Sequence, residues 1–87
     1  NGVPKLGRRN DYQRWQSIFA SEYQQLLSQL ENNLPTVIDP YGATNPCEFF
    51  AVVTETFFEK GQELQHNHGQ LYQVLRKYYC LEPLINC

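Results

Sequence analysis

The sequence predicts an all-α fold with three main helices, and the spacing of its apolar residues is the main observation behind this prediction. In the longest stretches these residues recur three and four positions apart, which is the pattern of one buried face of an α-helix. Residues that typically begin or end helices separate the stretches. The composition, with 41% apolar and 18% charged residues in a chain of 87, is typical of one small folded domain.

The first and longest helix is predicted from Asp11 to Glu31. Apolar and aromatic side chains fall on one stripe in nearly every turn, namely Tyr12, Trp15, Ile18, Phe19, Tyr23, Leu26, Leu27 and Leu30. Asn10 or Asp11 can cap the start of this helix, because either side chain accepts hydrogen bonds from unpaired backbone N–H groups. The letters ENNLP predict its end, since Asn tolerates left-handed geometry and Pro35 disfavours helical geometry at the residue before it.

The middle helix is predicted from Pro46 to Lys60, after a connector over Thr36–Thr44 that contains turn-forming residues. Asn45 is a suitable N-cap, and Pro suits the first helical position because the N–H that it lacks has no partner there in any case. The letters EFFAVV alone would also suit a strand, since β-branched and aromatic residues are poor helix formers. The start residues and the length of the apolar run favour a helix, which Gly61 is expected to end.

A last amphipathic helix is predicted after Gly69 and is expected to end near Pro83. Its apolar stripe consists of Leu71, Tyr72, Leu75, Tyr78 and Tyr79. A short turn or helix around Gln62–His66 is expected to connect it with the middle helix. Residues 1–87 are therefore assigned to a single domain.

Charge and hydropathy exclude two classes of partner. The net charge of −2, without a basic cluster beyond Arg8 and Arg9, provides no electrostatic surface for nucleic acid or for an anionic membrane. No apolar run reaches the roughly 18 residues that a bilayer span requires, and no secretion signal begins the chain. We therefore expect a cytoplasmic protein that binds neither nucleic acid nor membranes. The chain contains no Met, so we also expect it to begin inside a longer reading frame.

The cysteines and histidines do not form a recognisable metal motif. Cys47, Cys80 and Cys87 have spacings that match neither a disulfide framework nor paired zinc-binding cysteines, so we expect free thiols. The two histidines, His66 and His68, lie two positions apart, and such positions do not face each other on a helix. Both are expected to be ordinary surface residues.

Two carboxylates lie in the apolar middle helix, and each has more than one interpretation. Seven residues are close to two helical turns, so Glu48 and Glu55 fall on one face. Glu48 stands three residues after Asn45, the spacing of a capping box in which the Glu carboxylate bonds the N–H of the cap. Glu55 is either a polar residue on an exposed edge or a carboxylate with a buried role, which is costly unless it is paired or bound to a metal. Spacing alone leaves these alternatives open.

The segment DPYGATNPCEFFAVVTETFFE, with GVP near the start and LYQVLRKYYCLEP near the end, resembles the C-terminal half of the Mlc titration factor A family of zinc-dependent peptidases. Its core, Tyr-Gly-x-Thr-Asn-x-x-Glu-Phe-Phe-Ala, is also similar to a segment of the anthrax lethal factor metalloprotease domain. The resemblance implies the C-terminal part of a gluzincin-like catalytic domain. In that domain a His-Glu-x-x-His helix supplies two zinc ligands and the general base.

On this resemblance Glu48 corresponds to the third zinc ligand, and Tyr41 to the Tyr that stabilises the transition state. Glu55 would lie beyond the ligands and orient a ligand His. The chain itself contains no His-Glu-x-x-His, so the resemblance implies zinc binding and peptide hydrolysis in a full-length parent. The chain alone is expected to be inactive, since catalytic zinc needs three protein ligands.

The leading prediction is therefore the third-ligand part of a zinc-dependent metallopeptidase whose substrate is a peptide. The alternative is a helical interaction module, because the family is also implied to bind a transcriptional repressor and the many aromatic residues can form such a surface. A His-Glu-x-x-His motif shortly before Asn1 in the parent would favour the enzyme. Its absence there would favour the interaction module.

Overall fold

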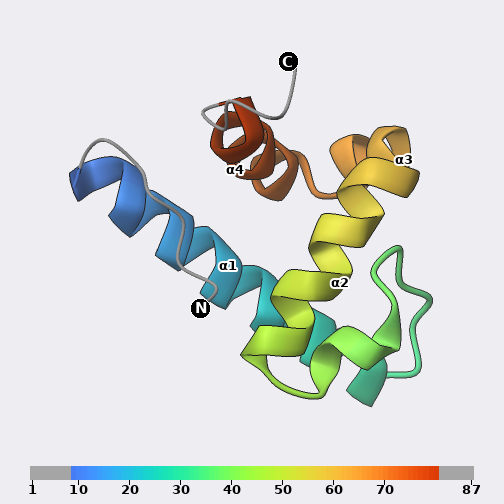
Figure 1. Ribbon diagram of the computed structural model, residues 1–87. Coiled ribbons are helices and arrows are strands. Elements are labelled where there is room, and N and C mark those ends of the chain that lie inside the picture. Colours follow the sequence, from blue (N-terminus) through green and yellow to red (C-terminus); the bar gives the residue numbers. More distant parts are fainter. Residues whose placement is uncertain (1–8, 81–87) are drawn as a thin grey trace.

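The computed structural model of this chain describes residues 9–80, which form four α-helices and one short 3-10 helix and contain no strand (Figure 1). The elements follow in the order α1 (Arg9–Glu31), η1 (Pro40–Ala43), α2 (Pro46–Glu59), α3 (Gly61–Asn67) and α4 (Gly69–Cys80). The all-α prediction is confirmed, and α1, α2 and α4 are the three main helices that the sequence predicts. The short α3 occupies the place where the sequence predicts a turn or a short helix.

The start of α1 differs from the prediction. Within the described residues the helix already includes Arg9, so Asn10 and Asp11 lie inside it, and the prediction that one of them caps the helix is wrong. The Asp11 carboxylate interacts with α4 instead, where Lys77 Nζ lies 2.9 Å from Asp11 Oδ1. An acidic residue in the first turn remains favourable, because the N-terminus of a helix carries partial positive charge.

The end of α1 is built as its sequence predicts. The helix ends at Glu31, and Asn33 adopts the left-handed region with a φ of 56°. The backbone N–H of Leu34 donates to the carbonyl of Gln29 at 2.9 Å, and that of Asn33 donates to Leu30 at 3.1 Å. These two bonds form a Schellman motif, which satisfies carbonyl groups that the end of the helix would otherwise leave unpaired.

The start of α2 also follows the prediction, which decides against a strand. Asn45 has an extended backbone, and its side chain accepts a 2.8 Å hydrogen bond from the N–H of Glu48. Pro46 occupies the first turn, where its missing N–H has no cost. The predicted end is wrong in one respect, because Gly61 does not end α2 but begins α3. The break lies at Lys60, whose φ of −135° and ψ of 46° depart from helical geometry.

One residue separates α3 from α4. His68 lies between them with a φ of −139°, and its N–H donates to the carbonyl of Leu64 at 2.7 Å. Within the described residues α4 extends to Cys80. The predicted end of the last helix near Pro83 lies outside the described residues.

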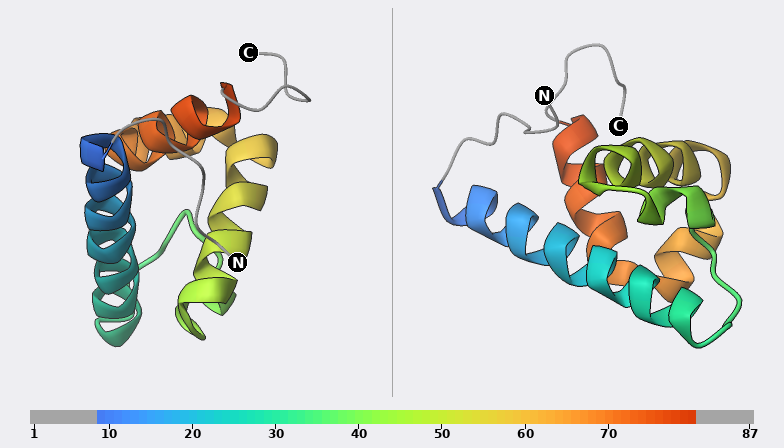
Figure 2. Two further views of the ribbon diagram at one scale, coloured as in Figure 1. Left: turned by 60° about the vertical axis from the view of Figure 1, so that its left-hand side comes forward. Right: turned by 90° about the horizontal axis from the view of Figure 1, so that it is seen from below.

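The core lies where three helices meet. Figure 2 shows α1 and α2 as two columns that α4 crosses at one end. Aromatic rings of α1 and α2 meet between the columns, for example Phe19 and Phe49, whose centroids lie 6.0 Å apart with their planes nearly perpendicular. The buried apolar residues are Trp15, Phe19, Leu26, Ile38, Phe49, Val52, Val53, Leu64, Leu71, Val74 and Leu75. Every helix contributes to this core, so the short chain folds around a single apolar interior.

Within residues 9–80 no helix has both the length and the apolar character that crossing a membrane requires.

Candidate functional site

The turn before α2 is a capped 3-10 helix that carries Tyr41. The Asp39 carboxylate accepts a 2.8 Å hydrogen bond from the N–H of Tyr41, and Pro40 begins the turn. At the other end, both the N–H and the hydroxyl of Thr44 donate to the Tyr41 carbonyl, at 3.1 Å and 2.7 Å. The backbone of Tyr41 is therefore held by side chains on both sides, and its place relative to α2 is well defined.

Gly42 attaches this turn to the core. The residue is buried, and a Cβ added to it would lie 3.4 Å from Val52 Cβ and 3.5 Å from both Leu26 Cδ2 and Phe49 Cδ1. Those distances are ordinary packing contacts, so the site has room for a methyl group but not for a larger side chain. A nearly bare backbone at Gly42 lets η1 lie directly against α1 and α2.

Tyr23 adds a second attachment from α1. Its hydroxyl donates a 3.3 Å hydrogen bond to the carbonyl of Ala43, the last residue of η1. Its ring meets Phe49 edge to face, with the centroids 5.4 Å apart. From the sequence, Tyr23 is assigned only to the apolar stripe of the first helix and Gly42 only to a turn, not to the site. The glycine beside Tyr41 was a visible signal, whereas the role of Tyr23 depends on a contact across 20 residues of sequence.

The side chain of Tyr41 points away from the core. It is 59% exposed, although the next residue in the chain is buried, and its hydroxyl has no partner among residues 9–80. A phenol that is exposed on a fixed turn is free to donate a hydrogen bond to another molecule.

Glu48 lies in the first turn of α2 and is half-buried. The capping interpretation is confirmed in part, because the Asn45 side chain accepts from the N–H of Glu48. The reciprocal bond of a capping box is not formed, and the Glu48 carboxylate has no hydrogen bond or ion pair with any described residue. Its oxygens are therefore open to a ligand.

Glu55 is exposed, so the apolar residues of α2 leave it a solvent-facing edge. It lines a cleft of about 300 Å³ between α2 and the connector, together with Thr36, Val37, Asp39, Pro40, Thr56, Glu59 and Lys60. Glu48, two turns earlier, does not line this cleft, and the rise of an α-helix separates the two positions by about 10 Å. The structure thus places Glu55 near Asp39 and Pro40 and apart from Glu48.

The part of the chain that the structure describes contains no group of three or more His, Cys, Asp or Glu side chains placed to hold a metal ion. Glu48 can supply one oxygen ligand to a metal ion, and the described residues place no complete set of ligands around it. Cys47 is exposed and unpaired, as predicted for a free thiol, while the side chains of Cys80 and Cys87 lie outside what is described.

The histidines differ from each other. His66 is exposed, as predicted. His68 is only 7% exposed, and its Nδ1 lies 2.7 Å from Glu22 Oε1, so the prediction of a surface residue is wrong for His68. Its partner lies on α1, and no pattern local to His68 indicates this contact.

Comparison with known proteins places the chain in a family. The model of the family "Glucose-regulated metallo-peptidase M90" matches residues 1–80. A Mlc titration factor A from Pectobacterium atrosepticum is 31% identical over 85 residues, which cover 95% of this chain and 32% of that protein. A Mlc titration factor A from Yersinia pestis is 29% identical over 90 residues, which cover 97% of this chain and 32% of that protein.

The chain thus spans about a third of the length of these relatives, less than the half that the sequence analysis inferred. No solved structure matches it, so the similarity to the lethal factor domain stays a prediction from the motif. The resemblance to the Mlc titration factor A family is confirmed. By the match of the family model to most of its length, this chain belongs to the glucose-regulated metallo-peptidase M90 family.

Proposed function

We propose that this chain forms the part of a zinc-dependent metallopeptidase that supplies one metal ligand, Glu48, and one catalytic phenol, Tyr41. The observation that carries this proposal is the junction of η1 and α2. Tyr41 stands exposed on a turn that Gly42 anchors in the core, and Glu48 follows in the first turn of the next helix with an unpaired carboxylate. Membership of a metallo-peptidase family supports the same chemistry.

Glu48 fits zinc as one of three protein ligands. Hydrolytic zinc sites combine N and O donors and keep one position open for water, and bound zinc activates that water and polarises the peptide carbonyl. The Asn45 cap and the packing of α2 hold the backbone of Glu48 in place, which limits the positions that its carboxylate can take. The other ligands would come from a part of the longer protein that the described residues do not contain.

Tyr41 would act on the substrate. When the carbonyl of a peptide bond becomes tetrahedral, its oxygen gains negative charge, and a fixed hydrogen-bond donor stabilises that charge. The two bonds of Thr44 to the Tyr41 carbonyl and the Asp39 cap fix the backbone from which the phenol extends. A donor that needs no rearrangement lowers the barrier more than a flexible one.

Glu55 is assigned a supporting role. We infer that its carboxylate accepts a hydrogen bond from a ligand His of the longer protein, because metal-bound His usually donates its second N–H to such a group. Its exposure on α2 leaves the carboxylate accessible to another segment.

The test uses a longer protein that contains this chain. Glu48→Gln should lower zinc content and peptide hydrolysis together, because a neutral amide is a poor zinc ligand. Tyr41→Phe should leave zinc content unchanged and lower kcat by about a hundredfold, the usual loss for one oxyanion donor. Glu59→Gln is the matched control, since Glu59 is an exposed carboxylate at the far end of the same helix. Full zinc content and full activity in Glu48→Gln would overturn the assignment.

A second candidate function is binding to a transcriptional repressor. The name of the relatives, Mlc titration factor A, refers to the titration of Mlc by those proteins. The observation in favour is a group of aromatic rings at the end of α2 and on α4, in which Phe58 is exposed and Phe57 and Tyr79 are half-buried. Phe58 is 55% exposed, and its ring contacts those of Phe57 and Tyr79 at centroid distances of 5.1 Å and 5.0 Å. Aromatic side chains of this kind are enriched in protein interfaces.

A further inference from the structure

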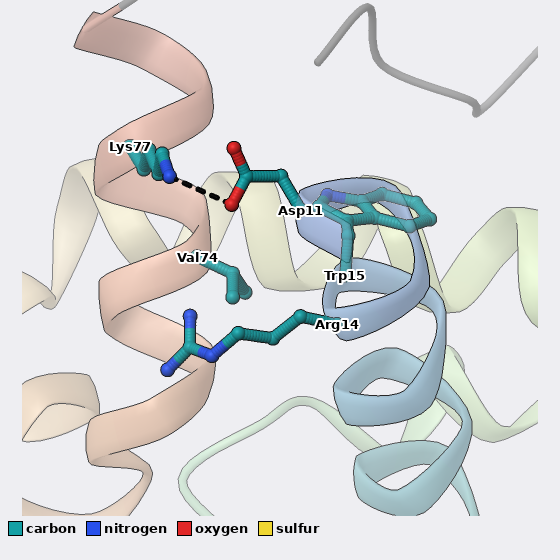
Figure 3. A pocket seen from close by; sticks show the side chains of 5 residues that line it. All are labelled: Asp11, Arg14, Trp15, Val74 and Lys77. Atoms are coloured by element: carbon teal, nitrogen blue, oxygen red, sulfur yellow. Dashed lines mark ion pairs between the residues drawn. The ribbon is translucent and has the colours of Figure 1, made fainter. Parts of the chain in front are cut away.

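A small cavity lies between the start of α1 and α4, away from Tyr41 and Glu48. Its volume is about 10 Å³, and it is lined by Asp11, Arg14, Trp15, Val74 and Lys77 (Figure 3). This volume is close to that needed for one water molecule and far below that of a phosphate or an organic ligand. Asp11 and the indole of Trp15 present hydrogen-bonding groups at this space, whose lining is otherwise largely apolar (Figure 3).

Trp15 has an unpaired donor at this cavity. The residue is 7% exposed, and its Nε1 is buried without a hydrogen-bond partner among residues 9–80. Figure 3 shows the indole nitrogen on the side of the ring that faces Asp11. An indole N–H can only donate, and buried donors in folded proteins are nearly always paired with protein or with ordered water.

Asp11 is a suitable acceptor that lines the same cavity. It precedes Trp15 by four positions, and side chains of a helix lean toward the N-terminus, so the indole lies over the turn of Asp11. Lys77 Nζ engages Asp11 Oδ1 at 2.9 Å. A carboxylate accepts several hydrogen bonds, so Asp11 keeps capacity for one more donor. Trp15 and Asp11 do not bond directly.

We propose that this cavity binds one ordered water molecule, which accepts a hydrogen bond from Trp15 Nε1 and donates one to the Asp11 carboxylate. Trp15 Nε1 and the Asp11 carboxylate give the water two polar partners, the lower end of the usual range for buried water. An anion is a poorer occupant, because the space is too small and Asp11 already contributes negative charge. The water would link Trp15 to Asp11 within α1, and so connect the indole N–H to the contact between Asp11 and Lys77 of α4.

The experiment is water-selective NMR on the 87-residue chain. Trp15 is the only Trp, so the indole N–H gives one side-chain signal that needs no further assignment. We expect a nuclear Overhauser effect between this proton and water that has the sign of a long-lived complex. A rotating-frame version of the experiment separates it from chemical exchange, which has the opposite sign. A wild-type signal with no such effect would overturn the proposal.

Two variants identify the source of the signal. Lys77→Gln removes the ammonium protons, which exchange with water and can imitate a bound molecule, so the effect should persist in this variant. Asp11→Ala removes the acceptor that holds the water, so the effect should fall several-fold. An effect that disappears in Lys77→Gln, or that remains at full strength in Asp11→Ala, would contradict a water bridge between Trp15 and Asp11.

Discussion

His68 Nδ1 lies 2.7 Å from Glu22 Oε1, and this contact joins the α3–α4 junction to α1 across 46 residues of sequence. Both side chains are largely removed from solvent, with 6% and 13% of their area exposed. A buried polar group is costly unless it is paired, so each residue accounts for the burial of the other. The contact also fixes the residue at which the chain turns from α3 into α4.

Glu22→Ala should destabilise the fold by about 1–3 kcal/mol, the cost of leaving a buried polar group such as the His68 imidazole without its partner. Glu22→Gln should cost less, because its amide oxygen still accepts a hydrogen bond. Glu31→Ala is the matched control, since Glu31 is an exposed carboxylate at the end of α1, and it should stay within about 0.5 kcal/mol. Urea unfolding monitored by circular dichroism measures all three. Equal midpoints for Glu22→Ala and Glu31→Ala would contradict a stabilising pair.

Gly42→Val should be more harmful than Gly42→Ala. The contacts of 3.4–3.5 Å around a Cβ at this position leave room for a methyl group, and Gly42 does not have a positive φ. Gly42→Ala should therefore change the free energy of unfolding by less than about 1 kcal/mol, with stabilisation as the expected direction. Gly42→Val adds branched atoms against Val52 and Phe49 and should cost about 1–3 kcal/mol through overpacking. Similar unfolding midpoints for the two variants would show that η1 moves freely away from α2.

The elements that the sequence predicts correctly are those whose signals are local. Asn45 and the Pro after it begin α2 because the cap bond spans three residues, and the end of α1 is set by the left-handed backbone of Asn33. The errors arise where a distant partner decides. Asp11 does not cap α1, since Lys77 of α4 engages its carboxylate, and His68 is buried by a residue of another helix. Local chemistry carries no information about such partners.

In the candidate site, too, the features set by local sequence are predicted correctly and those set by contacts between helices are not. Its motif places Tyr41 before α2 and Glu48 in the first turn, and both placements are confirmed. The attachment of η1 to the core through Gly42 and Tyr23 depends on packing between α1, η1 and α2, which the spacing of residues does not reveal. The exposure of Glu55 depends on how α2 is oriented in the fold. The proposed roles of Tyr41 and Glu48 in chemistry are tested by the Tyr41→Phe and Glu48→Gln variants.

Phe58→Ser tests the second candidate function in a longer protein that contains this chain. If the ring of Phe58 and its aromatic neighbours on α2 and α4 bind a repressor, loss of the Phe58 ring should weaken binding at least about fivefold, as expected for an aromatic interface residue. Leu34→Ser is the matched control, because Leu34 is 52% exposed and lies between α1 and η1, whereas Phe58 is 55% exposed at the end of α2. Titration calorimetry against the purified repressor measures both. Unchanged affinity in Phe58→Ser would exclude these rings from the interface.

The isolated chain should bind zinc weakly and hydrolyse no peptide. Residues 9–80 place no three metal-binding side chains together, and Glu48 supplies one ligand of the three that a catalytic zinc needs. Metal affinity depends on the complete set of ligands, because a single carboxylate recovers little of the free energy lost when zinc gives up its water. Calorimetric titration of the chain with zinc, beside a longer protein that contains it, measures the difference. The isolated chain could instead bind one zinc ion tightly, with the same affinity in Glu48→Gln. That result would show that other residues hold the metal. The role of Glu48 would then be limited to the start of α2, where its N–H donates to the Asn45 side chain.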